Sequence, residues 1–205
     1  MRRLDRRHLL ALAALIAATV VLDRAADLGF VTPARAAAQH YTLDAARSTV
    51  RFETDFGPDK ITGNMPVSAA DVILDFANVA NCRVAVRLDV SAASASFPFA
   101  AQALKGPKVL DAASHPEIIF QSTAVTRNGD GARVAGDITI RGVTRLIVLD
   151  ATIYRQSGTA AGDLSHLSVH LTGRVRRSDF GATGWADMVD DEVRIDILAR
   201  IDQGG

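Results

Sequence analysis

The residues of this 205-residue chain that could do chemistry are a few histidines, arginines and aspartates. His166 and His170 are four residues apart, a spacing that puts both on one face of a strand, where two imidazoles could hold zinc or copper. Arg174 and Arg176 follow on the same face, which indicates a surface in water, and no third ligand stands at a metal-binding spacing. We therefore predict that the protein holds no metal and no cofactor.

Signatures of catalysis are weak in the rest of the chain. His115 precedes Pro116, which restricts it to extended backbone and indicates a turn that enters a strand. The sequence has neither a G-x-S-x-G nucleophile elbow nor a glycine-rich phosphate loop. Cys82, the single cysteine, lies in an alternating apolar series and is predicted to be a buried hydrophobic residue rather than a reactive thiol. We predict that the protein is not an enzyme, with a hydrolase or isomerase of unrecognised site as an alternative.

Two short polar segments each place an arginine and an aspartate where a predicted strand ends. One interpretation is that these residues brace turns through hydrogen bonds. The other is that an arginine at the end of the fold binds an anionic group of a ligand by charge-assisted hydrogen bonds. The four residues are Asp137, Arg141, Arg177 and Asp179.

The elements that position these residues are strands, because the hydrophobic pattern after Tyr41 has a period of two. Glycine-rich turns join the strands, so neighbours must be antiparallel, since a parallel pair needs a crossover of roughly a dozen residues. The pattern gives eight or nine strands in a meander. The predicted strands are Ser48–Phe56, Ile61–Val67, Asp71–Phe76, Cys82–Ser91, Pro116–Val125, Arg133–Ile140, Val143–Arg155, His166–Arg176 and Glu192–Asp202.

These strands favour an all-β fold of one domain. A sandwich is possible, but closing the sheet removes its exposed edges, so we predict a closed antiparallel β-barrel of about eight strands. A short helical insertion is expected near residues 97–110, where Pro98 can start a helix. Aromatic residues make up only 5% of the chain, and the inward positions are mainly aliphatic. The interior therefore either packs as an aliphatic core or leaves space for a small ligand.

The N-terminus has the layout of a secretory signal peptide. Four arginines in residues 1–7 precede an apolar run of about 14 residues, which is short of the roughly 20 that span a bilayer. We predict cleavage after Ala36 or Ala38, with a signal peptide over residues 1–38 and one domain over residues 39–205. Export to the periplasm is expected, and paired arginines at Arg6 and Arg7 leave the Sec and twin-arginine routes both open.

The charge of the chain argues against nucleic acid as a partner. Basic and acidic residues number 23 each, and removing the six arginines and three aspartates of the first 38 residues leaves 17 basic and 20 acidic residues. A weakly acidic body lacks the clustered basic charge that neutralises phosphates. We therefore predict no binding of nucleic acid.

With the segments laid in order, the chain from Tyr41 to Ile201 resembles the YceI-like family of bacterial envelope proteins. Arg47 stands where the family's opening motif usually has histidine, and Ala95–Ala101 replaces the usual stretch before the helix. The motifs that carry the resemblance are Tyr41–Asp44, Arg47–Phe52, Leu110-Asp111, His115-Pro116, Ile119–Thr123, Gly136–Arg145 (GDITIRGVTR), Arg177–Gly181 (RSDFG) and Val193–Ile195.

The resemblance implies a lipocalin-like barrel in the periplasm with an elongated apolar tunnel for a polyisoprenoid or similar amphiphilic lipid. The helical insertion would be its natural lid, and Arg141 or Arg177 would stand near the polar end as a headgroup or barrel-mouth residue. An alternative is an interaction module for a membrane redox protein, and a membrane-surface contact and a homodimer are both left open. As a hypothesis, the tunnel is lined by Phe52, Val84, Val86, Phe120, Val169 and Ile195.

Overall fold

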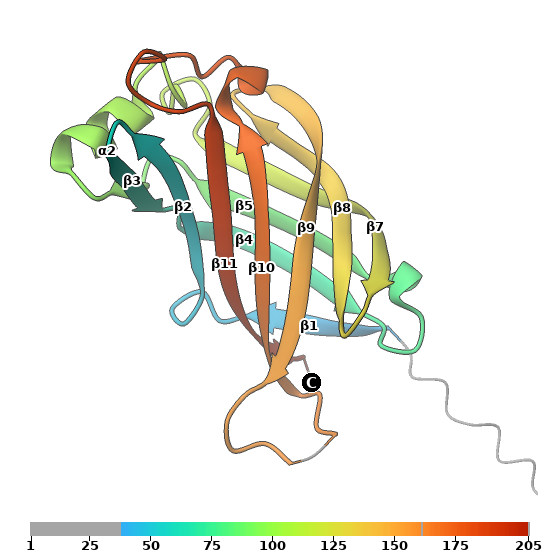
Figure 1. Ribbon diagram of the computed structural model, residues 1–205. Coiled ribbons are helices and arrows are strands. Elements are labelled where there is room, and N and C mark those ends of the chain that lie inside the picture. The colour runs from blue at the N-terminus through green and yellow to red at the C-terminus, as the bar shows by residue number, and fades with distance from the viewer. Residues whose placement is uncertain (1–37, 161, 205) are drawn as a thin grey trace, which may run out of the picture. The chain divides into compact units, whose positions relative to one another are not determined.

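The computed structural model describes residues 38–160 and 162–204, so the predicted signal peptide lies outside the described residues except for Ala38. Within this part of the chain, no helix is long and apolar enough to cross a membrane. The elements are mostly strands (Figure 1). In chain order they are β1 (Gln39–Leu43), β2 (Thr49–Phe56), β3 (Asp59–Asn64), β4 (Val67–Leu74), the 3-10 helix η1 (Val79–Asn81), β5 (Arg83–Asp89), β6 (Ser94–Ala95), α2 (Pro98–Lys105), β7 (Glu117–Asn128), β8 (Gly131–Ile140), β9 (Val143–Arg155), β10 (His166–Arg176), the 3-10 helix η2 (Arg177–Phe180) and β11 (Glu192–Gln203).

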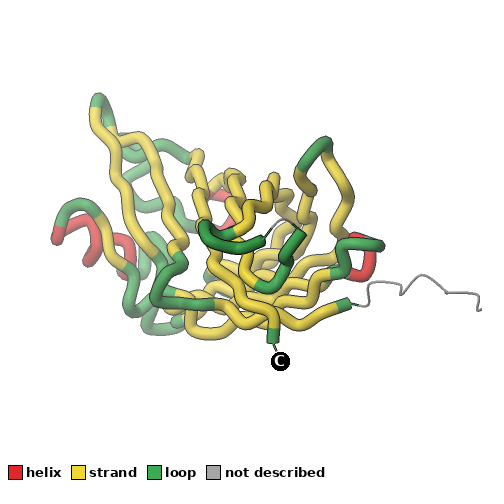
Figure 2. Tube along the Cα trace, turned by 90° about the horizontal axis from the view of Figure 1, so that it is seen from below, coloured by secondary structure: helices red, strands yellow, loops and turns green. Residues whose placement is uncertain are grey.

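The strands close into a barrel in which every pairing is antiparallel. Eight strands form the ring in the order β1, β4, β5, β7, β8, β9, β10 and β11, and β1 pairs with β11 to complete it. Figure 2 shows these strands from below, with the loops at their ends. The predicted closed antiparallel barrel is confirmed.

The strand β11 pairs with two different early strands along its length. The long strand β11 pairs with β1 near its end, at Leu43↔Ile201, and with β2 near its start, at Ile195↔Phe52. From β2 the sheet continues through β3 to the short β6, which leads into α2 (Figure 1). The sequence prediction did not assign β1 to a strand and drew one strand through Met65 and Pro66, where the chain instead turns between β3 and β4.

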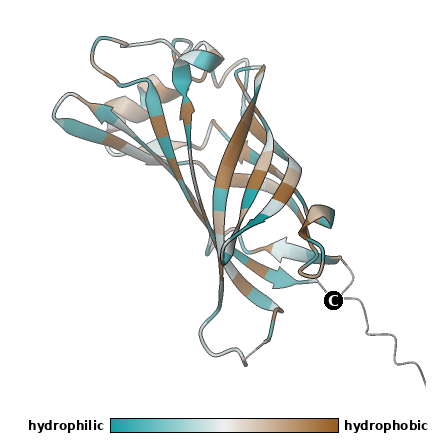
Figure 3. Ribbon diagram, turned by 45° about the vertical axis from the view of Figure 1, so that its right-hand side comes forward, coloured by the Kyte–Doolittle hydropathy of each residue, from teal (hydrophilic) through white to brown (hydrophobic). Residues whose placement is uncertain are grey.

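Polar and apolar residues alternate along the strands, seen as teal and brown bands in Figure 3. On β5, for example, Val84, Val86 and Leu88 face the interior while Arg83 and Arg87 are exposed. Inward side chains therefore come from each strand at every second position, as a barrel requires.

The most deeply buried side chains lie toward the two ends of the barrel rather than in its middle. Phe180 and Val90 are nearly inaccessible at the end that carries α2 and η2, and Leu167 and Ile201 are nearly inaccessible at the opposite end. Cys82 is buried too, as predicted. Apolar packing therefore stabilises the ends and leaves the centre free to be hollow.

Candidate functional site

The interior of the barrel is a cavity of about 960 Å³. The exposure of individual side chains indicates the same cavity. Side chains midway along the strands face the interior and yet are only partly buried, among them Val86, Val169, Ile195 and Ile197. Side chains in a close-packed core would lose nearly all contact with a water-sized probe. The volume falls at the upper end of the roughly 300–1,000 Å³ found for small-molecule sites.

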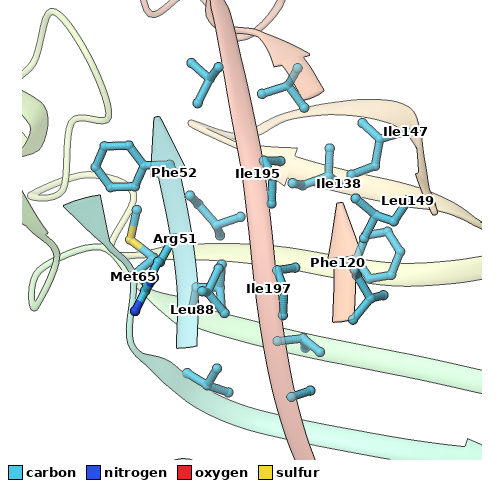
Figure 4. A pocket seen from close by; sticks show the side chains of 18 of the residues that line it. Arg51, Phe52, Met65, Leu88, Phe120, Ile138, Ile147, Leu149, Ile195 and Ile197 are labelled. Carbon is cyan, nitrogen blue, oxygen red and sulfur yellow. The ribbon is translucent and has the colours of Figure 1, made fainter. Parts of the chain in front are cut away.

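The cavity wall is aliphatic and aromatic, with contributions from strands on all sides. Figure 4 shows Phe52, Phe120 and Ile195, which come from β2, β7 and β11, around one shared space. The structure places all six predicted lining residues in this wall: Phe52, Val84, Val86, Phe120, Val169 and Ile195. That they contact a ligand stays a prediction.

The sequence reasoning missed other parts of the wall. Ile138, Ile147 and Leu149 line it from β8 and β9, and Ala103 and Leu104 line it from α2. The strand residues could have been found from the same alternation that gave the others. The helix residues could not, because the docking of α2 over the barrel end has no local signal in the sequence.

Two glycines make room for the large rings of the wall. Gly63 is the register partner of Phe52, and a Cβ at Gly63 would collide with that ring. A Cβ at Gly136 would lie 2.5 Å from the backbone oxygen of Gln121 and against the ring of Phe120. Each glycine therefore allows a phenylalanine to lie flat against the sheet.

Arg177, a predicted headgroup residue, touches the cavity but its guanidinium is committed to the protein. The side chain is buried and donates four hydrogen bonds of 2.7 to 2.8 Å to backbone carbonyls of the loop that follows η2. The acceptors are Ala182, Gly184, Val189 and Asp190. These contacts match the interpretation in which the arginine braces a turn.

Arg141, the other predicted mouth residue, is held in the same manner. Its Nη1 donates 2.7 Å hydrogen bonds to the carbonyls of Pro107 and Val109, and its own backbone is left-handed, with φ of 52°. It lies outside the cavity wall and fixes the segment between α2 and β7 to the β8–β9 turn. A headgroup role for either arginine therefore stays a prediction.

The opposite end of the cavity is organised by a buried carboxylate. Asp75 accepts hydrogen bonds from the backbone of Ala77 and Asn78 and from the side chain of Asn81, at 2.8 to 3.0 Å. Its own backbone N–H donates to Cys82 Sγ at 3.3 Å. These bonds fold the chain around η1 into a compact turn against the cavity.

The two histidines lie where the sequence predicted, on the outer face of the barrel. The Nδ1 atom of His166 is 2.7 Å from Asp202, and the Nε2 atom of His170 is 2.7 Å from Asp196. Each imidazole thus pairs across the β10–β11 ladder. In the part of the chain that the structure describes, no three His, Cys, Asp or Glu residues gather as metal ligands.

A closed antiparallel barrel around an apolar cavity defines a lipocalin-like barrel of the type that can enclose a single small apolar ligand. Residues 41–201 match the YceI-like domain, and the chain belongs to the YceI-like family.

Two relatives of the chain are UPF0312 proteins. A UPF0312 protein of Yersinia pestis (strain Pestoides F) is 30% identical over 92 residues, which is 45% of this chain and 47% of the relative. The chain thus spans about half the length of the Yersinia relatives it matches. A UPF0312 protein of Vibrio parahaemolyticus is 26% identical over 175 residues, covering 82% of this chain and 92% of the relative.

Solved structures share the fold at low sequence identity. BcnA of Burkholderia cenocepacia is 21% identical with a TM-score of 0.70, covering 78% of this chain and 99% of that one. A polyisoprenoid binding domain from Saccharophagus degradans, implicated in plant cell wall breakdown, is 13% identical with a TM-score of 0.56, covering 80% of this chain and 98% of that one.

Proposed function

We propose that this protein is exported to the periplasm, where it holds a polyisoprenoid or similar amphiphilic lipid inside the barrel and carries or stores it without chemical change. The observation that carries the proposal is the apolar cavity of about 960 Å³. The likeness in fold to the polyisoprenoid binding domain from Saccharophagus degradans supports the choice of lipid.

The wall of the cavity suits a branched hydrocarbon chain. Burial of each methylene contributes about 0.8 kcal/mol, so a few isoprene units offset the cost of ordering a flexible chain without strong polar contacts. The charged residues that line the cavity are Arg51, Asp75, Arg127, Asp130 and Arg177. Asp75 and Arg177 are hydrogen-bonded into turns, and Arg127 donates a hydrogen bond to the carbonyl of Phe76. Selectivity would then come mainly from the length and width of the cavity.

The proposal is tested by extracting the purified protein with organic solvent and analysing the extract by mass spectrometry. We expect a stoichiometric long-chain lipid. Val86→Trp should fill part of the cavity and lower the lipid content several-fold, whereas Val148→Trp adds the same side chain on the outer face of β9 and should leave it unchanged. Ala199→Phe, also in the wall, provides a second filling variant, and thermal unfolding checks that each variant is folded.

A second function has one observation in its favour. Leu146 and Val148 on the outer face of β9 are 66% and 48% exposed, which would suit docking of another envelope protein such as a membrane redox protein. A lipid-free extract, together with failure to take up a fluorescent polyprenyl probe, would overturn the carrier and leave this interaction module as the better hypothesis.

A further inference from the structure

One end of the barrel carries an aromatic rim, formed by Phe97, Phe99, Trp185 and Met188. Phe99 is 72% exposed, and Phe97 and Met188 are each 48% exposed. All four residues also line the cavity. The rim is therefore the place where the cavity wall continues into an exposed apolar surface.

The two phenylalanines are not explained by the stability of α2. Phe97 is the N-cap residue of the helix and makes no side-chain capping bond, although Ser, Thr, Asp or Asn at that position would make one. Ala103 and Leu104 form the side of the helix that faces the cavity. Phe99 extends into solvent beside them, where a large apolar side chain gains nothing unless another surface covers it.

The loops that frame this end are held in uncommon backbone conformations. Among the described residues, the non-glycine residues with positive φ are Asp111, Arg141 and Trp185, at 50°, 52° and 54°. All three lie in the segments around the rim: the loop after η2 bonds to Lys108 and Gly57, and Arg141 bonds to the segment after α2. Strained residues of this kind persist where the surroundings fix them, and they cluster at functional sites.

The charge beside the rim is basic on the side of α2. From residue 90 to residue 110 the chain has no acidic residue, and it carries Lys105 and Lys108. The ammonium of Lys108 lies 5.9 Å from the centre of the Trp185 ring. Asp187 and Asp190 belong to the loop after η2, which also carries Trp185 and Met188, so the basic charge of the rim comes from the α2 segment.

We propose that the aromatic rim inserts into the surface of a bilayer containing anionic lipid, so that cargo passes directly between membrane and cavity. The inference rests on the proposed lipid-carrying function. Segments that lie in a membrane interface typically combine exposed aromatic and other apolar side chains with neighbouring lysines. The lysines attract anionic headgroups. A cargo of long hydrocarbon would then avoid crossing water, because the exposed rim and the cavity share the same residues.

The test is cosedimentation of the purified protein with vesicles of phosphatidylethanolamine and phosphatidylglycerol, and with vesicles of phosphatidylcholine alone. The double variant Phe97→Ser, Phe99→Ser should lose binding on the order of a hundredfold, since each phenylalanine leaving water contributes on the order of tenfold. Leu146→Ser, Val148→Ser is the matched control, because it removes a similarly exposed apolar pair from the outer wall and should leave binding unchanged.

The charged part of the proposal has its own variant. Lys105→Gln, Lys108→Gln should weaken binding to the anionic vesicles several-fold and leave the weak binding to phosphatidylcholine unchanged. Added salt should reduce anionic binding of the wild type in the same direction. Equal binding by the wild type and the phenylalanine variant, or an equal loss in the outer-wall variant, would overturn the proposal.

A second readout separates this proposal from the function on which it rests. Uptake of dansyl-farnesol from detergent-free solution measures the cavity alone. Uptake by the wild type without vesicle binding refutes the membrane contact and keeps the carrier. Vesicle binding that depends on the two phenylalanines, without uptake of the probe, supports the contact and refutes the lipid cargo.

Discussion

Replacing Arg177 with methionine tests whether this arginine braces the fold or binds an anionic ligand group. Methionine keeps much of the volume but removes all four hydrogen bonds to the carbonyls of the loop after η2. Breaking one side of a buried charged network costs about 3–5 kcal/mol, because the remaining polar groups lose their partners. For a chain of this size, such a loss lowers the Tm by roughly 10 °C.

The assay can follow the loop and the barrel separately. Trp185, the single tryptophan, lies in the loop that Arg177 organises, so its fluorescence reports the loop while far-ultraviolet circular dichroism reports the strands. Arg176→Met is the matched control, since Arg176 is the adjacent and exposed residue, and its replacement should change stability by less than about 0.5 kcal/mol.

The two roles of Arg177 give opposite results. Bracing predicts a large loss of stability with little change in preference between a neutral and a phosphorylated prenyl probe. A headgroup role predicts nearly unchanged unfolding and a selective loss of the phosphorylated probe. An unfolding midpoint within about 1 °C of the wild type would refute the reasoning from the four hydrogen bonds.

Three further outcomes are expected. Gly136→Ala should destabilise the protein by about 1–3 kcal/mol in urea unfolding, because the new methyl group meets a backbone oxygen and a phenyl ring; an unchanged midpoint would contradict this. Hydrogen bonds from Lys60 and Arg194 lower the pKa of Glu53, and a hydrogen bond from Arg194 lowers the pKa of Asp55. The two carboxylates therefore stabilise the fold fully above their ordinary pKa values of 4.5 and 3.8, and this stabilisation is lost as the pH falls through the lower pKa values of the folded protein. Arg194→Met should make the Tm fall less steeply with pH in this acid range. Cys82 should react with a thiol reagent only when the protein opens, and a bound lipid should slow that reaction, whereas fast labelling at native pH would show that the thiol is accessible.

Much of the fold could be predicted from the sequence, because alternation along a strand is a local property. The pattern of β5 and of β11 already assigned which residues face inward, and short glycine turns required antiparallel neighbours. The strand β1 was missed, since five residues with Tyr41 as the one buried side chain carry little pattern. Its role in closing the ring comes from pairing with β11, more than 150 residues away in the chain.

The candidate site divides in the same way. The sequence by itself determined the apolar character of the wall, including Phe52, Phe120 and Ile195, since the type of a side chain and the face of the strand on which it lies are both local properties. Only the tertiary structure decided that the interior is hollow, that the guanidinium of Arg177 donates its hydrogen bonds to backbone carbonyls, and that Phe97 and Phe99 lie at the cavity rim. The physical reason is that free volume and hydrogen-bond partners depend on how segments far apart in the chain pack together. A local pattern determines which way a side chain faces, but not how far it lies from the segments across the barrel.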